Sequence, residues 1–468
     1  MKSSYNLKYI TAISLVSALG GLLFGYDWVV IGGAKPFYEQ FFSIADMPYL
    51  QGWAISSALV GCVGGTFLSG FLSDKYGRKN LLILASVFFT VSAAGTGASC
   101  SFTIFILYRI LGGLGIGLAS NLSPVYIAEV TPANIRGKFV SINQLTIVLG
   151  ILLAQIVNWQ IAKPVPENAT ADFILHSWNG QTGWRWMFWA EMVPASIFFL
   201  LMWLVPESPR FLVRKRKYER SFSILEKIGG KDYAGERIRD IKDSLRQNTG
   251  RLNLKVLWSP GITGIVVIGV VLAVFQQWCG INVIFMYAEE IFTAAGYSVS
   301  DMLFNIVITG SVNLVFTFVA MALVDKVGRK TLMLIGAGSL AVIYTIMGFF
   351  YYIGVQGFPL LILVVMAIAA YAMTLAPVTW VILSEIFPNK VRGAAMAVST
   401  FALWTANALL AYSFPVINKS IQASGSFWLF AGISVFGFFF IRAKLTETKG
   451  KTLEQIEKEL IGKPVTEE

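Results

Sequence analysis

The amino-acid sequence predicts an all-α membrane protein built from two related bundles of six transmembrane helices. Three observations predict this fold class. The 468 residues are 56% hydrophobic and 13% charged, with a mean hydropathy of +0.66, whereas soluble domains contain about 25% charged residues. The apolar residues gather in stretches that are long enough to cross a bilayer, which takes about 20 residues. Short loop motifs of the first half also recur in the second half.

Twelve apolar stretches form two sets of six on either side of a polar interval. They lie at residues 9–31, 50–72, 80–101, 102–128, 139–162 and 184–205, then at 261–291, 303–324, 331–354, 358–386, 393–417 and 426–442. The interval carries apolar residues at helical spacing, among them Leu225, Ile228 and Ile238, so we expect short amphipathic cytoplasmic helices there. The expected domains are an N-terminal bundle at 1–205, the cytoplasmic helices at 206–260, a C-terminal bundle at 261–442 and a tail at 443–468.

Lysine and arginine concentrate in the loops of one side. If both termini are cytoplasmic, the termini and the even-to-odd loops hold 32 of the 37 lysine and arginine residues. Cationic loops are retained on the cytoplasmic side. We therefore expect a multi-pass protein of the cytoplasmic (inner) membrane with both termini inside. The net charge of +11 then reflects this topology and contact with membrane lipids, and no nucleic-acid partner is expected.

The sequence lacks the patterns of a metal site, a disulfide framework or an enzyme. Cys62, Cys100 and Cys279 fall inside predicted spans, where we expect small buried apolar residues, and the single histidine, His176, is expected at the surface. The glycines between Gly112 and Gly117 lie within an apolar span, which favours close helix packing over phosphate binding. Because no nucleophile and base are paired, we expect neither an enzyme nor a bound cofactor or metal.

Three loop motifs occur once in each half. GFLSDKYGRK at 70–79 matches ALVDKVGRK at 322–330, EVTPANIRG at 129–137 matches EIFPNKVRG at 385–393, and PESPR at 206–210 is more distantly similar to TETKG at 446–450. We expect Glu129 to bond with Arg136, and Glu385 with Arg392, because a carboxylate at one helix end and an arginine at the start of the next form charge-assisted hydrogen bonds. The alternative is that these residues are only topology signals and turn formers. We expect a cytoplasmic gating network made of Asp74, Arg78, Glu129, Arg136, Glu207, Asp325, Arg329, Glu385 and Arg392.

These motifs, together with QQWCGIN at 276–282, resemble the sugar porter family of the major facilitator superfamily. The resemblance covers essentially the whole chain. GLLFGYD at 21–27, YRILGGLGIGLAS at 108–120 and VSINQ at 140–144 are most similar to the bacterial D-xylose–proton symporters. The resemblance implies the major facilitator fold, with twelve transmembrane helices in two pseudo-symmetric bundles, and transport of a sugar by alternating access.

Ionisable residues are rare inside the predicted spans. Asp27 and Arg109 are conspicuous there, and Glu191 is a third candidate. Each costs about 2.5–3.5 kcal/mol at the centre of a span, so they are expected to pair or to face water. Desolvation raises the pKa of an aspartate and a neighbouring arginine lowers it, so a change of environment loads or releases a proton. We expect Asp27 as proton carrier, Arg109 as modulator and Glu191 as contributor; a static salt bridge is the alternative.

Amides and aromatic rings within the spans are candidates for binding a sugar, because hydroxyls need bidentate partners and the C–H faces of the ring need flat apolar surfaces. Hydrogen bonds between helices are the alternative role for each amide. The resemblance implies that these positions match the family's sugar-contacting pattern. The expected substrate-binding residues are Phe24, Gln144, Gln276, Gln277, Asn282, Asn313, Trp380, Trp404 and Asn407.

The sequence thus predicts a monomeric proton-coupled monosaccharide symporter that imports a neutral sugar and takes the proton as its only co-substrate. Leu403 stands where the xylose symporters have an amide, so D-xylose and D-glucose both remain candidate substrates. Gly280 and Pro377 are expected to interrupt helices near the sugar site. A uniporter without proton coupling is the main alternative, and a transporter-like sugar sensor is a further one.

Overall fold

The structure is a computed structural model that describes residues 5–166, 169–247, 257–259, 262–388, 391–449 and 455. Within these residues the chain is helical and contains no strand. It divides into two compact units, one formed by 1–30, 57–157 and 185–251 and the other by 31–56, 158–184 and 252–468. This division differs from the four domains proposed above, whose boundaries stay a prediction. Residues 31–56 and 158–184, although N-terminal in sequence, group with the C-terminal helices.

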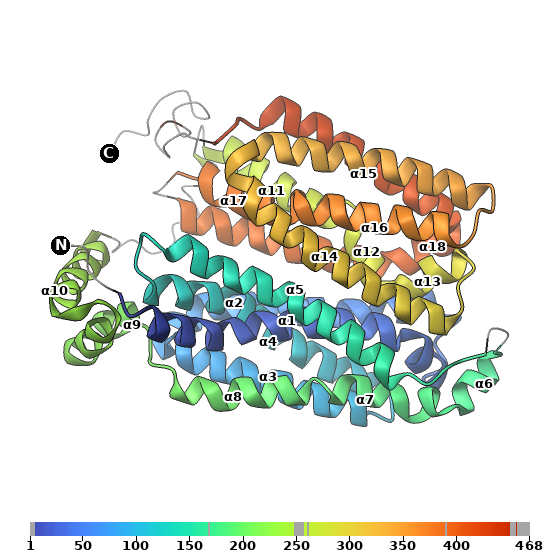
Figure 1. Cartoon of the computed structure of the whole chain (residues 1–468), viewed down its shortest axis with the longest axis horizontal. Helices are drawn as coiled ribbons and strands as arrows, with labels where there is room; N and C mark the ends of the chain where they lie inside the picture. The colour runs from blue at the N-terminus through green and yellow to red at the C-terminus, as the bar shows by residue number, and fades with distance from the viewer. Residues whose placement is uncertain are drawn as a thin grey trace. The chain divides into compact units, whose positions relative to one another are not determined.

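Eleven helical elements precede residue 250 (Figure 1). They are α1 (Leu7–Phe41), α2 (Pro48–Tyr76), α3 (Arg78–Ala98), α4 (Phe102–Val130), α5 (Arg136–Ile161), α6 (Ala171–His176), the π-helix η1 (Asn179–Gly183), α7 (Trp184–Trp189), α8 (Met192–Leu204), α9 (Pro209–Arg214) and α10 (Tyr218–Gln247). Helix α1 continues ten residues past its predicted end at 31. The residues that follow the apolar stretch, such as Lys35 and Glu39, are polar but still helical.

The C-terminal half repeats this succession of long helices. Its elements are α11 (Ile262–Trp278), α12 (Ile281–Met286), α13 (Ala288–Ala294), α14 (Val299–Val327), α15 (Arg329–Tyr352), α16 (Phe358–Met373), α17 (Leu375–Ile386) and α18 (Arg392–Lys444). Helix α18 contains a non-helical residue, Gln422, with φ 60° and ψ 177°. This kink lies between the last two predicted spans, so α18 accounts for both.

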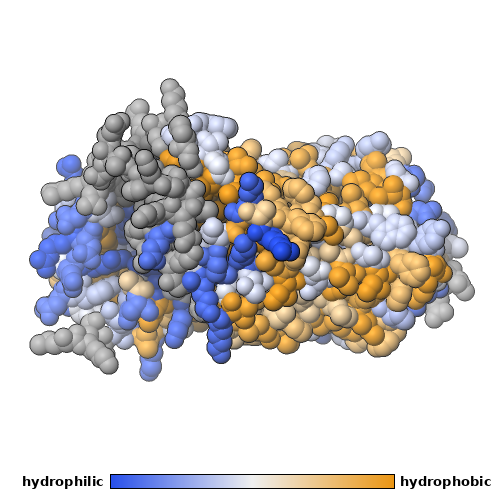
Figure 2. All heavy atoms as spheres, turned by 90° about the horizontal axis from the view of Figure 1, so that it is seen from above, coloured by the Kyte–Doolittle hydropathy of each residue, from blue (hydrophilic) through white to orange (hydrophobic). Residues whose placement is uncertain are grey.

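Eleven of the described helical segments are long and apolar enough to cross a membrane, and the kinked α18 is one of them. Large apolar side chains such as Val342, Phe349, Phe436 and Phe439 are more than half exposed. In Figure 2 hydrophobic residues cover much of one face, and hydrophilic residues gather toward one end. Exposed apolar surface of this extent is stable in lipid and not in water. The predicted multi-pass, all-α membrane fold is confirmed.

Glycines bring α2 and α4 into close contact within the N-terminal unit. A Cβ atom on Gly113 would lie 1.9 Å from the carbonyl oxygen of Ala58, and one on Gly117 would lie 2.3 Å from that of Cys62. From the other side, a Cβ atom on Gly61 would lie 2.1 Å from the carbonyl oxygen of Ile110. Small residues permit this approach of two helix backbones. The glycine run of α4 therefore serves helix packing, as the sequence predicts.

Two transmembrane helices of the C-terminal unit are broken where the sequence predicts interruptions. Helix α11 ends at Trp278 and α12 begins after Gly280, which has φ 90°, a conformation that favours glycine. Helix α16 ends at Met373, four residues before Pro377. A proline ring clashes with the carbonyl group four residues earlier, which explains why the break falls at this position.

In the described part of the polar interval, residues 206–247 and 257–259, most of the chain is helical. Helix α10 contains Gly230, with φ 87° and ψ 176°, so it consists of two shorter helices, and Leu225 and Ile228 are buried. The amide N–H of Asn6 donates to the carbonyl oxygen of Ile228 at 2.9 Å. One expectation is wrong: Cys100 lies in the turn between α3 and α4 and is exposed, whereas Cys62 and Cys279 are buried.

Candidate functional site

The N-terminal unit brings its three intramembrane ionisable residues together. Asp27 of α1 forms an ion pair with Arg109 of α4, and the side chains of both are 2% exposed. An Nη2 atom of Arg109 also lies 3.5 Å from the backbone oxygen of Asp27, and the guanidinium lies 5.7 Å from the ring centre of Phe188. Glu191, between α7 and α8, is 2% exposed and interacts electrostatically with both charged partners.

The charges of this cluster do not balance. One guanidinium faces two carboxyl groups, and burial of an unpaired carboxylate is unfavourable. Among the described residues, Oδ2 of Asp27 and Oε1 of Glu191 are buried without a hydrogen-bond partner. Space beside Asp27 is provided by Gly112, where a Cβ atom would lie 2.8 Å from Oδ2. The cluster therefore holds two carboxyls in a place where one cation neutralises only one of them.

Four of the predicted sugar-binding amides form a chain in the C-terminal unit. Nε2 of Gln277 donates to Oε1 of Gln276 at 2.8 Å, and Nδ2 of Asn282 donates to Oε1 of Gln277 at 2.5 Å. Nδ2 of Asn282 also lies 3.4 Å from Oδ1 of Asn407. All four are buried, and Nδ2 of Asn407 has no hydrogen-bond partner within the described structure. The turn at Gly280 brings Asn282 back toward Gln277 and closes the chain.

The other predicted substrate-binding residues are distributed over both units. Trp404 and Asn313 are buried, and Trp380 is half-buried on α17, directly after the break that precedes Leu375. In the N-terminal unit, Phe24 stacks on Trp28 with ring centres 5.1 Å apart. Gln144 is half-buried on α5. Each half of the chain therefore supplies amides and aromatic rings of the types that bind a sugar.

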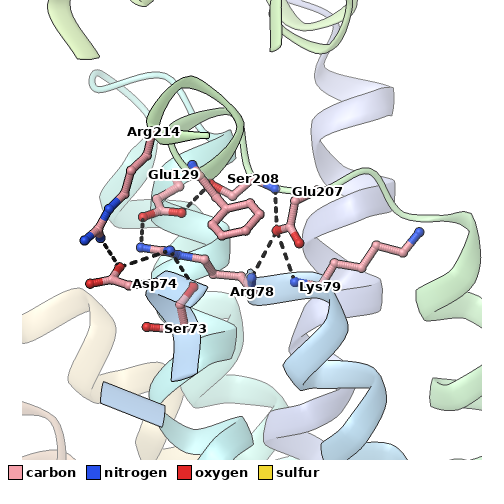
Figure 3. A network of polar contacts seen from close by, with 9 residues as sticks. Ser73, Asp74, Arg78, Lys79, Glu129, Glu207, Ser208 and Arg214 are labelled. Atoms are coloured by element: carbon pink, nitrogen blue, oxygen red, sulfur yellow. Dashed lines mark hydrogen bonds and ion pairs between the residues drawn. The ribbon is translucent and has the colours of Figure 1, made fainter. Parts of the chain in front are cut away.

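Figure 3 shows the predicted gating network as it occurs in the N-terminal unit. Nη2 of Arg78 donates to Oε1 of Glu129 at 3.0 Å, and its Nη1 lies 3.6 Å from Asp74. Asp74 also pairs with Arg214 of α9, and Ser208 donates to Glu129. Arg78 thus links the ends of α2 and α4, and α9 is held to the same charges.

Glu207 occupies the N-terminus of α3 in this network. Its Oε1 accepts hydrogen bonds from the backbone N–H groups of Arg78 at 3.0 Å and Lys79 at 3.2 Å. A carboxylate at this position satisfies helix N–H groups that have no partner within the helix and interacts favourably with the helix dipole. The residue before α3, Gly77, has φ 92°, a backbone conformation that favours glycine. The PESPR motif thus fixes the start of α3.

The C-terminal unit repeats these contacts with a different set of residues. Nη2 of Arg329 pairs with Glu385 at 3.4 Å. Glu447 accepts from the backbone N–H groups of Arg329 at 2.8 Å and Lys330 at 3.1 Å, as Glu207 does for α3. Gly328 before α15 has φ 108°. The sequence repeat is therefore a repeat of hydrogen bonds. Glu447 was missing from the predicted network, although the TETKG motif contains it.

The two capping carboxylates differ in their surroundings. Burial raises the pKa of Glu207 above its usual value of 4.5, against the backbone N–H groups of Ser208, Lys79 and Arg78, which lower it. Burial acts less strongly on Glu447, so that hydrogen bonds from backbone N–H groups, including that of Lys449, lower its pKa overall. Glu207 is therefore the carboxylate whose charge is more costly to keep.

The remaining predicted network residues take other positions. Nε of Arg136 is buried and lacks a hydrogen-bond partner within the described part of the chain, and the Glu129 carboxylate pairs with Arg78. Nε of Arg392 donates to the carbonyl oxygen of Phe387 at 3.1 Å. The side chain of Asp325 lies outside what the structure describes. Another buried amide, Asn143 on α5, was not predicted; it is adjacent to Gln144 in the VSINQ motif, which was the available signal.

These features define a class of protein. The long apolar helices, two of which are broken within the C-terminal unit, carry buried ionisable residues and one buried chain of amides. Broken helices and buried polar groups at membrane depth are typical of secondary transporters. Groups of three or more histidine, cysteine or carboxylate side chains placed to hold a metal ion are not found in the described structure. The fold and the site together are those of a multi-pass membrane transport protein.

Comparisons with known proteins specify the family. The family model described as "Sugar (and other) transporter" matches residues 13–460, and the chain belongs to this family. It is 40% identical to the D-xylose-proton symporter of Escherichia coli K12 over 98% of this chain and 97% of that protein. It is 38% identical to the arabinose-proton symporter of Bacillus subtilis 168 over 97% and 96%, and 37% identical to a glucose transport protein of a Synechocystis strain over 97% and 98%.

Solved structures agree with this assignment. The inward-open conformation of the E. coli xylose transporter XylE is similar to this chain, with a TM-score of 0.83 and 38% identity, over 96% of this chain and 99% of that one. The XylE proton:xylose symporter bound to 6-bromo-6-deoxy-D-glucose has a TM-score of 0.79 and 39% identity, over 97% and 100%. The predicted membership of the major facilitator superfamily and its fold are confirmed.

Proposed function

We propose that this protein is a proton-coupled monosaccharide symporter of the cytoplasmic membrane that works by alternating access. The observation that carries the proposal is the buried cluster of Asp27, Arg109 and Glu191, in which one cation faces two carboxyl groups. Relatives over nearly the full length are named proton symporters of xylose and arabinose. The co-transported ion is the proton, and no cofactor or metal takes part. The protein works as a monomer.

Asp27 is the proton carrier in this proposal. Its ion pair with Arg109 favours the charged carboxylate, whereas burial away from water favours the protonated form. A conformational change that separates the pair or admits water alters this balance and so loads or releases the proton. Glu191 contributes by competing for the same guanidinium. The transported proton is shared by the cluster, because both carboxyls face the one guanidinium.

The amide chain from Gln276 to Asn407 is the main part of the proposed sugar site. Its amides bond to one another, and each retains further donor or acceptor positions for the hydroxyl groups of a neutral sugar. Trp380 and Trp404 supply flat apolar surfaces, and Asn313, Phe24 and Gln144 are the remaining proposed sugar contacts. Leu403 is buried next to Trp404, and we propose that this apolar residue relaxes selectivity between D-xylose and D-glucose.

Both termini and the two capped networks face the cytoplasm in the proposed topology, because lysine and arginine concentrate there. The networks around Arg78 and Arg329 act as gating elements: they hold helix ends in fixed positions and rearrange as the cytoplasmic side opens and closes. Arg136, whose Nε is buried without a partner among the described residues, is the member that gains a carboxylate partner in another conformation.

Uptake by the purified protein in sealed vesicles tests the function. Vesicles with an acidic exterior and a negative interior should accumulate labelled D-xylose or D-glucose, and a protonophore should abolish the accumulation. Competition between the two sugars then establishes the substrate. A uniporter would equilibrate sugar without accumulating it and without alkalinising the medium. A sugar sensor would bind sugar but show no exchange of labelled for unlabelled substrate.

A further inference from the structure

A second buried ionic cluster lies in the unit that contains the C-terminal helices, separate from Asp27 and Arg109. Nζ of Lys35, near the end of α1, lies 3.0 Å from Glu39, 3.0 Å from Glu289 and 2.8 Å from Glu290. The side chains of Lys35 and Glu39 are 2% and 4% exposed. Nε2 of Gln51 donates to Glu39 at 3.0 Å and so fixes the second oxygen of this carboxylate.

The backbones that carry these charges are in direct contact. A Cβ atom on Gly32, one turn before Lys35, would lie 2.6 Å from the carbonyl oxygen of Phe285 in α12. Residues 31–56 belong to the same compact unit as α12 and α13. The charged groups therefore sit at a tight junction between the end of α1 and the second half of the broken helix that contains the sugar-binding amides.

The partners of Lys35 are divided between two helices. Glu39 lies one turn later on α1 itself, whereas Glu289 and Glu290 lie on α13. If α1 and α13 separate, Lys35 retains Glu39 as a counter-ion on its own helix. Glu289 and Glu290 are already 25% and 19% exposed. The cluster can therefore come apart without leaving a buried charge unpaired, which a static buried ion pair cannot do without a large cost.

Water has access to the junction. A cavity of about 340 Å³ is lined by the four charged groups and by Asp46 and Lys419, and a cavity of roughly 15 Å³ already holds one water molecule. Carboxylates released from Lys35 would be hydrated there. The cavity thus provides the solvent that the open form of the junction requires.

We propose that Lys35 is a positioning residue that latches the extracellular gate: it draws Glu289 and Glu290 of α13 to the end of α1 and so holds the external access path closed. Lys35 is the one cation of this four-residue cluster, and its three partners are carboxylates. Without Lys35 the carboxylates would repel one another in the closed form. This inference rests on the proposed function, because a gate is needed only if the sugar site opens to one side at a time.

A second tie secures the same closed form without charge. The backbone N–H of Val165 donates to Oγ of Ser300 at 2.9 Å, and Oγ of Ser300 lies 3.4 Å from the backbone oxygen of Val165. Trp159, six residues before Val165, packs on Phe304, one turn after Ser300 in α14, with ring centres 5.6 Å apart. Loss of Lys35 should therefore shift the gate toward its open form without unfolding this region.

Distances between two spin labels report the state of the gate. Tyr49 is 63% exposed and Ala294 is exposed, and both flank the junction, so they accept labels after the three native cysteines are replaced by serine. A long distance between the labels reports the open gate and a short one the closed gate. In the full-length protein, in detergent and in vesicles, the population with the long distance divided by that with the short distance should rise at least about tenfold in Lys35→Met. Lys35→Arg, which keeps the charge, should stay within about threefold of the parent protein.

Lys419→Met is the matched control, because this lysine lines the same cavity but forms no ion pair with Glu289 or Glu290 within the described residues. It should leave the distances unchanged. If Lys35→Met does not fold, Glu289→Gln with Glu290→Gln leaves Lys35 paired to Glu39 and removes its attraction to α13, so it should give a shift in the same direction. Unchanged distances in these variants, or an equal shift in Lys419→Met, overturn the latch. The distances are measured without sugar or a proton gradient, so failure of acid-driven uptake refutes the symporter and not the latch.

Discussion

Replacement of Asp27 by asparagine is the sharpest test of proton coupling. Asparagine keeps the size of the side chain but cannot carry the proton. One charge that moves across 100 mV gains about 2.3 kcal/mol, which supports an accumulation of about 50-fold for a neutral sugar. Asp27→Asn should reduce this ratio to 1, because the sugar then moves without the proton. Exchange of labelled for unlabelled sugar, which needs no net proton movement, should continue.

The stability of this variant follows from the geometry of the cluster. Removing one partner of a buried pair destabilises a protein by about 3–5 kcal/mol, because the other charge stays buried and unpaired. Glu191 is buried and interacts with Arg109, so it replaces Asp27 as the counter-ion, and we expect the single variant to fold. The double variant with Glu191→Gln has no such replacement and should show the full loss.

The assay is uptake of labelled sugar into vesicles with an imposed potential of 100 mV, negative inside, with thermal unfolding of the same preparations in detergent. Asp172→Asn is the control carboxylate, since its side chain is 83% exposed in α6 and its replacement should leave accumulation unchanged. Concentrative uptake by Asp27→Asn at the parent level would refute the assignment of the proton. A double variant as stable as the parent would refute the charge balance on which the cluster depends.

Three further outcomes are expected. Asn282→Ala removes the middle of the amide chain and should weaken sugar binding about 5- to 150-fold, since a lost hydrogen bond in a buried polar network costs about 1–3 kcal/mol; unchanged affinity in a calorimetric titration would contradict this. Gly280→Ala introduces a Cβ atom 2.6 Å from the Phe430 ring at φ 90° and should lower the unfolding temperature, whereas Gly264→Ala, with open space around it, should not. Glu207→Gln weakens the cap of α3 by about 1 kcal/mol, which hydrogen exchange of the first α3 amides would detect as faster exchange; equal rates would argue against the cap.

The sequence predicted much of the fold because lipid imposes simple rules. Spans must be apolar and about 20 residues long, so the starts and ends of most helices follow from hydropathy. Helix α1 shows the limit of this argument, since it continues through Lys35 to Phe41. A polar residue ends an apolar stretch without ending a helix, and only contacts with α12 and α13 explain why the polar turns are buried. The apolar stretches likewise predict a break between residues 417 and 426, but not that it is a kink at Gln422.

The sequence predicted which residues form the candidate site, and it predicted some of the contacts between them. Asp27 and Arg109 were expected to pair because isolated charges are costly in a membrane, and they do pair. Glu129 was expected near Arg136 from their shared motif, yet its partner in this structure is Arg78. Sequence spacing shows that Glu129 and Arg136 belong to one loop. It does not show which of several arginines on different helices lies nearest to the Glu129 carboxylate. Glu447 lies in the TETKG motif, whose similarity to PESPR is apparent in the sequence. Its role as the cap of α15 is seen only from its hydrogen bonds in the structure.

Composition, the apolar stretches and the doubled motifs by themselves determined that this chain spans a membrane as two related sets of helices, with a few charges and amides inside the spans. These properties depend on which residues are present and on their order. Tertiary structure alone decided that Lys35 gathers glutamates from two helices, that Gln276, Gln277, Asn282 and Asn407 form one chain, and that a single guanidinium faces two carboxyls. The physical reason is that such contacts join residues far apart in sequence, where the energy depends on distance and burial that no local pattern encodes.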